Sequence, residues 1–126
     1  MKILGLIPAR GGSKGILHKN RKSLYGKPLI QYTIEAGLAC EGIDTLLVST
    51  DEEQIKSISL KAGAVVPFLR PAKLATDRSP SIDTVIHALD FFKNQNKNFD
   101  AVCLLQPTCP FRTSKDITDA IDIFKQ

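Results

Sequence analysis

The chain has 126 residues, of which 43% are hydrophobic and 24% charged, and its formal net charge is +4 at pH 7. This composition is typical of a folded globular domain and excludes a disordered chain. The length allows one domain, residues 1–126. The basic residues form no long run, which favours an anionic ligand over nucleic acid. The longest apolar runs are shorter than the ~20 residues that a membrane span needs, so we expect no membrane partner.

The N-terminus and the cysteines predict a cytoplasmic location. Arg10 interrupts the first apolar run too early for a secretory signal. Cys40, Cys103 and Cys109 are odd in number and lack the spacing of a metal site. We therefore expect reduced thiols in a cytoplasm.

Strand and helix patterns alternate along the chain. In order, the sequence predicts a strand at 3–9, a polar loop at 10–27, a helix from Pro28, a strand at 45–50, a helix at 52–62, a strand at 65–69, an irregular loop at 70–81, a helix capped by Ser81 or Asp83, a strand at 101–106, a loop and a helix from about Ser114. Asp51 is expected to cap the second helix and Gly63 to end it. The alternation predicts an α/β fold, a Rossmann-like three-layer α/β/α arrangement with a mainly parallel sheet.

Each of three predicted helices has an apolar face that we expect to be buried. These faces are Leu29, Ile30, Thr33, Ile34 and Leu38 in the first helix, Ile82, Val85, Ile86, Leu89 and Phe92 in the third, and Ile117, Ala120, Ile121 and Phe124 in the last. The last helix continues to the final residue without a cap. This pattern predicts a domain that is incomplete at its C-terminus.

A polar loop follows every predicted strand. The loops are ARGGSKG, STD, RPAKLATDRSPS and QPTCPFR. Ligands of parallel α/β sheets bind beyond the carboxyl ends of the strands. We therefore expect the four loops to form one site.

The loop after the first strand has the composition of a phosphate-binding loop. Small residues let backbone N–H groups converge on an anion, and nearby cations add charge-assisted hydrogen bonds. Gly11, Gly12 and Ser13 would supply the N–H groups, and Arg10, Lys14 and Lys19 the charge. The alternative is an exposed basic turn. Walker A and G-x-G-x-x-G spacings are absent, which argues against a P-loop ATPase and a dinucleotide enzyme.

Five blocks in order carry a family resemblance: IPARGGSKGILHKN, GKPLIQYTIEA, VSTD, FLRPAKLATDRSPSID and LLQPTCPFRT. The chain resembles the N-terminal part of the CMP-sialic acid synthetases, or acylneuraminate cytidylyltransferases. The resemblance implies a fold of the nucleotide-diphospho-sugar transferase type. It also implies transfer of CMP from CTP to an acidic nine-carbon sugar, an N-acylneuraminate or related nonulosonic acid, with release of pyrophosphate.

The resemblance also implies roles for individual residues. Arg10 and Lys19 would be catalytic by contacting the triphosphate, and Gln106 would face the sugar acid. The implied nucleotide-binding residues are Ala9, Arg10, Gly11, Gly12, Ser13, Lys14, Asn20, Arg70, Ser79 and Ser81. Mg²⁺ would be the cofactor, with ligands outside this chain and none within it. The full-length protein would be a homodimer.

Several residues also have simpler interpretations. Arg70 could form a surface ion pair, Ser81 could only cap a helix, and Asp51 fits a cap better than a metal ligand. His18 and His87 are too isolated for a metal site, and His87 is expected to be a packing or surface residue.

Two substitutions depart from the family pattern. Cys109 replaces a usual serine, and Leu17 replaces a usual proline. Neither changes a charged contact. The alternative to an enzyme is a truncated nucleotide-binding remnant without turnover.

Overall fold

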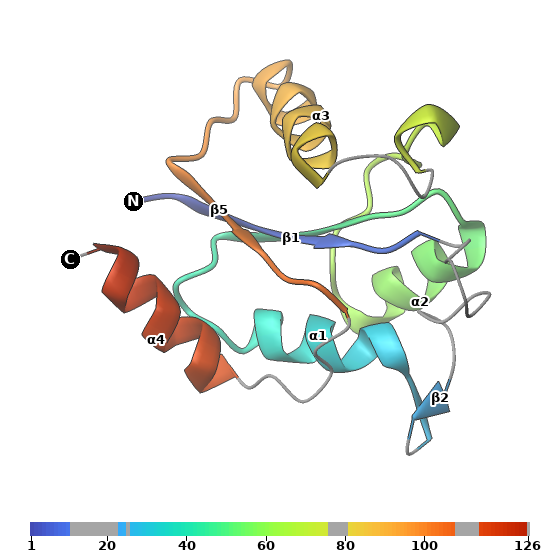
Figure 1. Ribbon diagram of the computed structural model, residues 1–126, viewed down its shortest axis with the longest axis horizontal. Coiled ribbons are helices and arrows are strands. Elements are labelled where there is room, and N and C mark those ends of the chain that lie inside the picture. The colour runs from blue at the N-terminus through green and yellow to red at the C-terminus, as the bar shows by residue number, and fades with distance from the viewer. Residues whose placement is uncertain (11–22, 25, 76–80, 108–113, 126) are drawn as a thin grey trace.

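The computed structural model describes residues 1–10, 23–24, 26–75, 81–107 and 114–125. Strands and helices alternate along the chain, with a short hairpin near the N-terminus (Figure 1). The elements are β1 (Ile3–Pro8), β2 (Ser23–Leu24), β3 (Lys27–Pro28), α1 (Leu29–Leu38), β4 (Thr45–Ser49), α2 (Glu53–Ala62), a 3-10 helix (Ala72–Leu74), α3 (Ser81–Lys93), β5 (Ala101–Leu104) and α4 (Ser114–Lys125).

The main sheet is parallel and has the order β4-β1-β5. Leu6 of β1 lies opposite Leu47 of β4 on one side and Leu104 of β5 on the other. A bridge between Leu47 and Val65 adds a further segment beyond β4. The chain therefore builds the sheet outward from β1 in one direction and then returns to the other side of β1. Such a reversal of strand order is the position where α/β sheets bind ligands.

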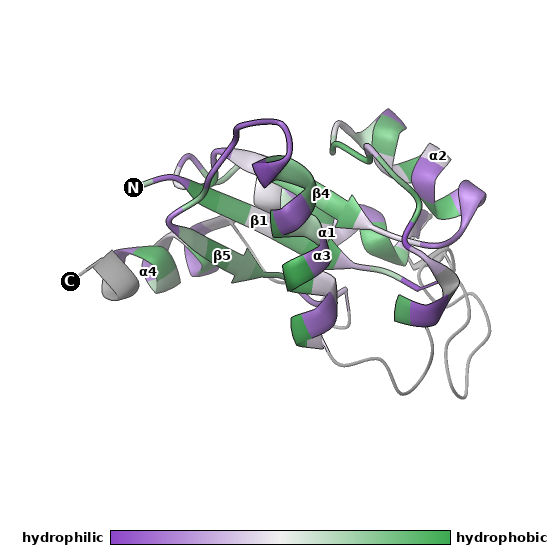
Figure 2. Cartoon of the chain, turned by 90° about the horizontal axis from the view of Figure 1, so that it is seen from above, coloured by the Kyte–Doolittle hydropathy of each residue, from purple (hydrophilic) through white to green (hydrophobic). Residues whose placement is uncertain are grey.

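Helices cover both faces of the sheet, with α3 on one face and α1, α2 and α4 on the other (Figure 1). Side chains alternate along β1, so Ile3 and Ile7 face one layer and Leu4 and Leu6 face the other. The three strands are largely hydrophobic where they run through the middle of the domain (Figure 2). The predicted three-layer α/β/α arrangement is confirmed.

Each face has its own apolar core. The core under α3 is the smaller one and consists of Leu4, Leu6, Leu47, Ala88 and Phe92. The core against the other three helices includes Ile3, Ile7, Ile30, Ile34, Leu46, Val48, Ile55, Ile117 and Ile121. The two cores fix β1 and β4 from both sides, which makes the ends of these strands a rigid base for the loops that follow.

The predicted strand at 65–69 is wrong beyond its first residue. Val65 makes both of its parallel ladder bonds, donating to Leu46 O and accepting from Val48 N, each at 3.0 Å. The next donor in that ladder would be the N–H of residue 67. Residue 67 is a proline and has no N–H, so the ladder stops there.

The buried faces of the helices differ in part from the predicted ones. In α3 the buried residues are Thr84, Ala88 and Phe92, whereas Ile82 and Ile86 are exposed. The small Thr84 and Ala88 let the helix lie close to the sheet, and this contact sets the face. In α4 and α1, Ala120 and Leu38 are also exposed, while the other members of the two faces that the structure describes are buried or half-buried. The side chain of Phe124 lies outside the described residues.

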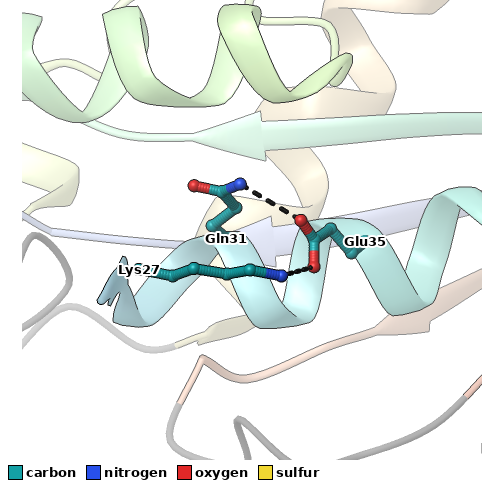
Figure 3. Close-up of polar contacts among 3 residues, drawn as sticks. All are labelled: Lys27, Gln31 and Glu35. Carbon is teal, nitrogen blue, oxygen red and sulfur yellow. Dashed lines mark hydrogen bonds and ion pairs between the residues drawn. The ribbon is translucent and has the colours of Figure 1, made fainter. Parts of the chain in front are cut away.

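The predicted loop at 10–27 contains two short strands, β2 and β3, which pair in an antiparallel hairpin. Lys27 at the end of this hairpin is tied to α1. Its Nζ lies 2.6 Å from Glu35 Oε1, and Gln31 Nε2 donates to the other Glu35 oxygen at 3.1 Å (Figure 3). These bonds raise the pKa of Lys27 and lower the pKa of Glu35. Helix α1 then starts at Leu29, directly after Pro28.

Helix α2 ends as predicted but begins differently. Gly63 at its C-terminus has φ 106°, the left-handed conformation that glycine adopts without strain. At the N-terminus the cap position is Glu52, not Asp51, and no side chain bonds there as a cap. The hydroxyl of Thr50 instead accepts the N–H of Glu52 at 3.2 Å. Asp51 is exposed one residue too early to reach the first turn as a cap.

Within the described part of the chain, no helix is both long enough and apolar enough to cross a membrane. Among the residues that the structure describes, Cys40 and Cys103 form no disulfide. Cys109 lies outside the described residues.

Candidate functional site

The carboxyl ends of the three main strands are hydrogen-bonded to one another. Ala9, just after β1, donates its N–H to Ser49 O of β4 at 2.9 Å. Leu105, just after β5, donates its N–H to Leu6 O of β1 at 2.8 Å. The residues that follow these strands therefore start from one edge of the sheet. We call this edge the carboxyl rim, formed by residues 9–10, 49–51, 70–75 and 105–107.

Arg70 is the residue that joins the segments of the carboxyl rim. Its backbone N–H donates to Thr50 O at 2.7 Å. Its Nε donates to Ser49 Oγ at 3.0 Å, and its Nη2 donates to Ser49 O at 2.5 Å. Its Nη1 donates to Leu74 O at 3.2 Å, in the 3-10 helix. At least three of the five N–H groups that a guanidinium carries thus have acceptors in the protein.

The guanidinium of Arg70 is buried, and only 4% of the residue is exposed. Burial lowers the pKa of Arg70 to about 10, the charge of Asp51 opposes this shift, and the charge of Arg10 adds to it. Arg10 and Arg70 come from different loops, and their charges interact at the rim. The interpretation of Arg70 as a surface ion pair is wrong, because the side chain is inside the fold and bonds to neutral oxygens.

His87 lies beside Arg70. Its ring packs edge-on against Phe68, with the centroids 4.6 Å apart. Burial and the charge of Arg70 both lower the pKa of His87, while Asp90 opposes the shift. Its buried Nδ1 has no hydrogen-bond partner among the residues that the structure describes. Of the two interpretations predicted for His87, a packing or a surface residue, the contact with Phe68 favours packing.

The structure describes four of the other predicted site residues, and three of them, Ala9, Arg10 and Gln106, belong to the rim. Ala9 is fully buried, Arg10 is half-buried at the end of β1, and Gln106 is half-buried two residues after β5. Ser81 is exposed and is the first residue of α3, so it lies inside the helix and not at the preceding cap position. Asp83 lies in the first turn. The predicted site residues Gly11, Gly12, Ser13, Lys14, Lys19, Asn20 and Ser79 lie outside the described residues.

Ser49 and Thr50 are rim residues that sequence reasoning did not select. Both are polar and both are completely buried. Ser49 accepts from Arg70 and Ala9, and Thr50 accepts from Arg70 and Glu52. The sequence signal that could have identified them is the pair of consecutive hydroxyl residues at the end of an apolar strand. Buried polar groups need hydrogen-bond partners, so such a pair indicates a bonded position.

The rim does not by itself provide a cation site. In the parts of the chain that the structure describes, no three His, Cys, Asp or Glu side chains lie close enough together to hold a metal ion. A separate hollow of 260 Å³ lies along β5, lined by Ile3, Ala101, Val102, Cys103, Leu104, Ala120 and Ile121. That lining is almost wholly apolar, so the hollow does not fit an anionic ligand.

The rim residues therefore favour an anion over a cation. A buried guanidinium and a second arginine lie where the strand order reverses. Anions at such positions are bound by loop N–H groups and by arginine.

Known proteins resemble this chain over nearly its whole length. A family model described as cytidylyltransferase matches residues 4–126. The chain is 48% identical over 125 residues to the CMP-N,N'-diacetyllegionaminic acid synthase of Legionella pneumophila, covering 99% of this chain and 54% of that protein. It is 43% identical over 124 residues to the N-acylneuraminate cytidylyltransferase of Escherichia coli, covering 98% of this chain and 28% of that protein.

A solved structure confirms the fold. The chain superposes on CMP-2-keto-3-deoxy-manno-octonic acid synthetase complexed with CTP, with a TM-score of 0.81 and 22% identity, over 99% of this chain and 48% of that one. The chain thus spans about half or less of the length of these proteins. Because the family model covers nearly all of its residues and the fold agrees, the chain belongs to the cytidylyltransferase family.

Proposed function

We propose that this chain is the nucleotide-binding part of an enzyme that transfers CMP from CTP to a nine-carbon 2-keto acid sugar and releases pyrophosphate. The observation that carries the proposal is the buried guanidinium of Arg70, which is bonded to the same Ser49 that anchors the residue before Arg10, so that the charge of Arg10 acts on Arg70 at the carboxyl rim. Like charges held together in a partly buried site repel, and a bound polyanion such as a triphosphate relieves that repulsion.

Arg10 and Lys19 are proposed as the catalytic residues. Arg10 directly follows Ala9, whose N–H is anchored on Ser49, so the start of the glycine-rich loop is fixed to the sheet. Phosphoryl transfer depends on positioning and on positive charge around the leaving group, and it needs no covalent nucleophile. Gly11, Gly12, Ser13, Lys14 and Asn20 would complete the contacts with the triphosphate and ribose.

The remaining residues divide into nucleotide and sugar contacts. We propose that Ala9, Arg70, Ser79 and Ser81 surround the nucleotide and that Gln106 faces the sugar acid. The sheet order supports this division, because Arg70 lies over β4 on one side of β1 and Gln106 follows β5 on the other. A nucleotide and an acceptor could then meet over the end of β1.

Mg²⁺ is proposed as the cofactor, with protein ligands outside this chain. The described residues offer no cluster of carboxylates that fits the ion, so no step is assigned to it here. We also propose a homodimer for the full-length protein, no nucleic-acid or membrane partner, and a cytoplasmic location. The buried Cys40 forms no disulfide with any described residue, which supports the location.

The acceptor is proposed as a nonulosonic acid. Two relatives support this class of acceptor, because one is named for a legionaminic acid and the other for an N-acylneuraminate. These are both acidic sugars, and the positive rim suits a carboxylate as well as a phosphate.

The test is pyrophosphate release from CTP in the presence of Mg²⁺ and either N-acetylneuraminate or N,N'-diacetyllegionaminate. We expect release that requires both substrates and is slower in Arg10→Ala. CTP binding without release would assign the chain to a nucleotide-binding module without turnover. No binding of CTP at all would overturn the proposal.

A further inference from the structure

We propose that Ser49 is a positioning residue for the nucleotide site, because its hydroxyl orients the guanidinium of Arg70. The inference rests on the proposed function, in which Arg70 contacts the nucleotide. The buried Ser49 would hold Arg70 in the position from which it contacts the nucleotide.

Two adjacent donors of the guanidinium bind the same residue. Nε donates to Ser49 Oγ at 3.0 Å, and Nη2 donates to Ser49 O at 2.5 Å. Nε and Nη2 lie on one edge of the planar guanidinium, so two bonds to one residue fix both the position and the plane of the group. The third bond, from Nη1 to Leu74 O, holds the opposite edge.

The backbone of Ser49 places this contact relative to the glycine-rich loop. Its carbonyl accepts from Arg70 and also from the N–H of Ala9, the residue before Arg10. Ser49 is therefore the point from which the relative placement of Arg10 and Arg70 is set. A shift of the Arg70 side chain away from Ser49 would change the separation of the two charges.

Of the two Ser49 groups that bind Arg70, only the hydroxyl depends on residue 49 being a serine. Any residue at position 49 supplies the carbonyl, but only a side-chain acceptor holds Nε. The Ser49 side chain is completely buried at the end of an apolar strand. A buried hydroxyl is unfavourable unless it is hydrogen-bonded, and its bond in the structure is the one from Arg70.

The experiment compares two buried serines. Ser49→Ala removes the acceptor of Arg70 Nε. Ser59→Ala is the matched control, because Ser59 is also completely buried and its hydroxyl bonds only within α2, to Ile55 O. We expect CTP affinity, measured by calorimetry, to fall about fivefold in Ser49→Ala, the effect of one ordinary hydrogen bond, and to stay unchanged in Ser59→Ala.

A second arm tests whether Ser49 acts through Arg70. Arg70→Lys removes Nε and its planar fork, so Ser49→Ala should cause no further loss of affinity in that background. Ser49→Cys keeps the volume with a weak acceptor and serves if Ser49→Ala does not fold; it should weaken CTP binding by a similar factor.

The possible outcomes separate the inference from the proposed function. No CTP binding by the unchanged chain overturns the function and this inference with it. CTP binding that is equal in the unchanged chain, Ser49→Ala and Ser49→Cys overturns the inference alone. A loss of the same size with and without the Arg70→Lys change also overturns it, because the serine would then act by another route.

Discussion

Arg70 donates two hydrogen bonds to Ser49, one to its hydroxyl and one to its carbonyl oxygen. Both acceptors are neutral, and so is the third, Leu74 O. Among the residues that the structure describes, the acceptors of the buried guanidinium are all neutral oxygens, and the charge of the exposed Asp51 favours its charged form. Such an arrangement keeps a cation fixed while its charge still attracts an anion.

Replacing Arg70 with methionine should destabilise the fold. The change removes the Arg70 donor from Ser49 Oγ and from Leu74 O, and it leaves Ser49 O with the N–H of Ala9, so we expect the free energy of unfolding to fall by about 1–3 kcal/mol. The decrease in the free energy of unfolding is limited because the variant no longer has to bury the guanidinium charge, which is itself unfavourable. Urea unfolding measures it, with Lys61→Met on the exposed face of α2 as the control. Equal stabilities of the two variants would show that Arg70 does not brace the rim.

His87 should make the stability depend on pH. Its pKa is lowered in the fold, so below pH 6.5 the unfolded chain binds more protons than the folded one at this site. The free energy of unfolding should therefore fall as the pH drops from 7.5 toward 5.5. His87→Phe keeps an aromatic ring beside Phe68 and should flatten this dependence. Parallel pH profiles for the unchanged chain and His87→Phe would contradict the assignment.

Gly63 should resist replacement by alanine. Its φ of 106° is strained for any residue with a Cβ, and an added Cβ would lie 3.1 Å from Leu38 Cδ1. We expect Gly63→Ala to lower the free energy of unfolding by about 1–2 kcal/mol. Gly63→Asn should lose less, because asparagine tolerates the left-handed conformation better. Thermal unfolding of the two variants tests the order, and an alanine variant as stable as the unchanged chain would refute it.

The fold was predictable because its signals are local. Apolar runs such as 3–8 and 45–49 alternate with helical patterns, and Gly63 ends α2 as expected. The prediction of a strand at 65–69 was wrong because it rested on apolar composition. Pro67 has no N–H, so the hydrogen-bond ladder that starts at Val65 stops there. The predicted buried face of α3 was right for Val85, Leu89 and Phe92 and wrong for Ile82 and Ile86, which are exposed. The helix carries more apolar residues than its one contact with the sheet can bury.

The site was predictable only in outline. Arg10, Arg70 and Gln106 were assigned to one edge of the sheet from the order of the strands, and the structure places all three there. The burial of Arg70 was not foreseen, since it depends on Ser49 and Leu74, which come from two other segments. A sequence shows an arginine after an apolar run but not the oxygens that converge on it.

The central claim is that the carboxyl rim binds the triphosphate of CTP through Arg10. Calorimetric titration of CTP into the unchanged chain, Arg10→Ala and Lys2→Ala tests it most directly, because Lys2 is an exposed cation before the other end of β1. We predict that Arg10→Ala weakens binding by about 1.5–3 kcal/mol, the worth of a hydrogen bond to a charged group, and that Lys2→Ala has no effect. Equal CTP affinity in all three proteins would contradict the claim.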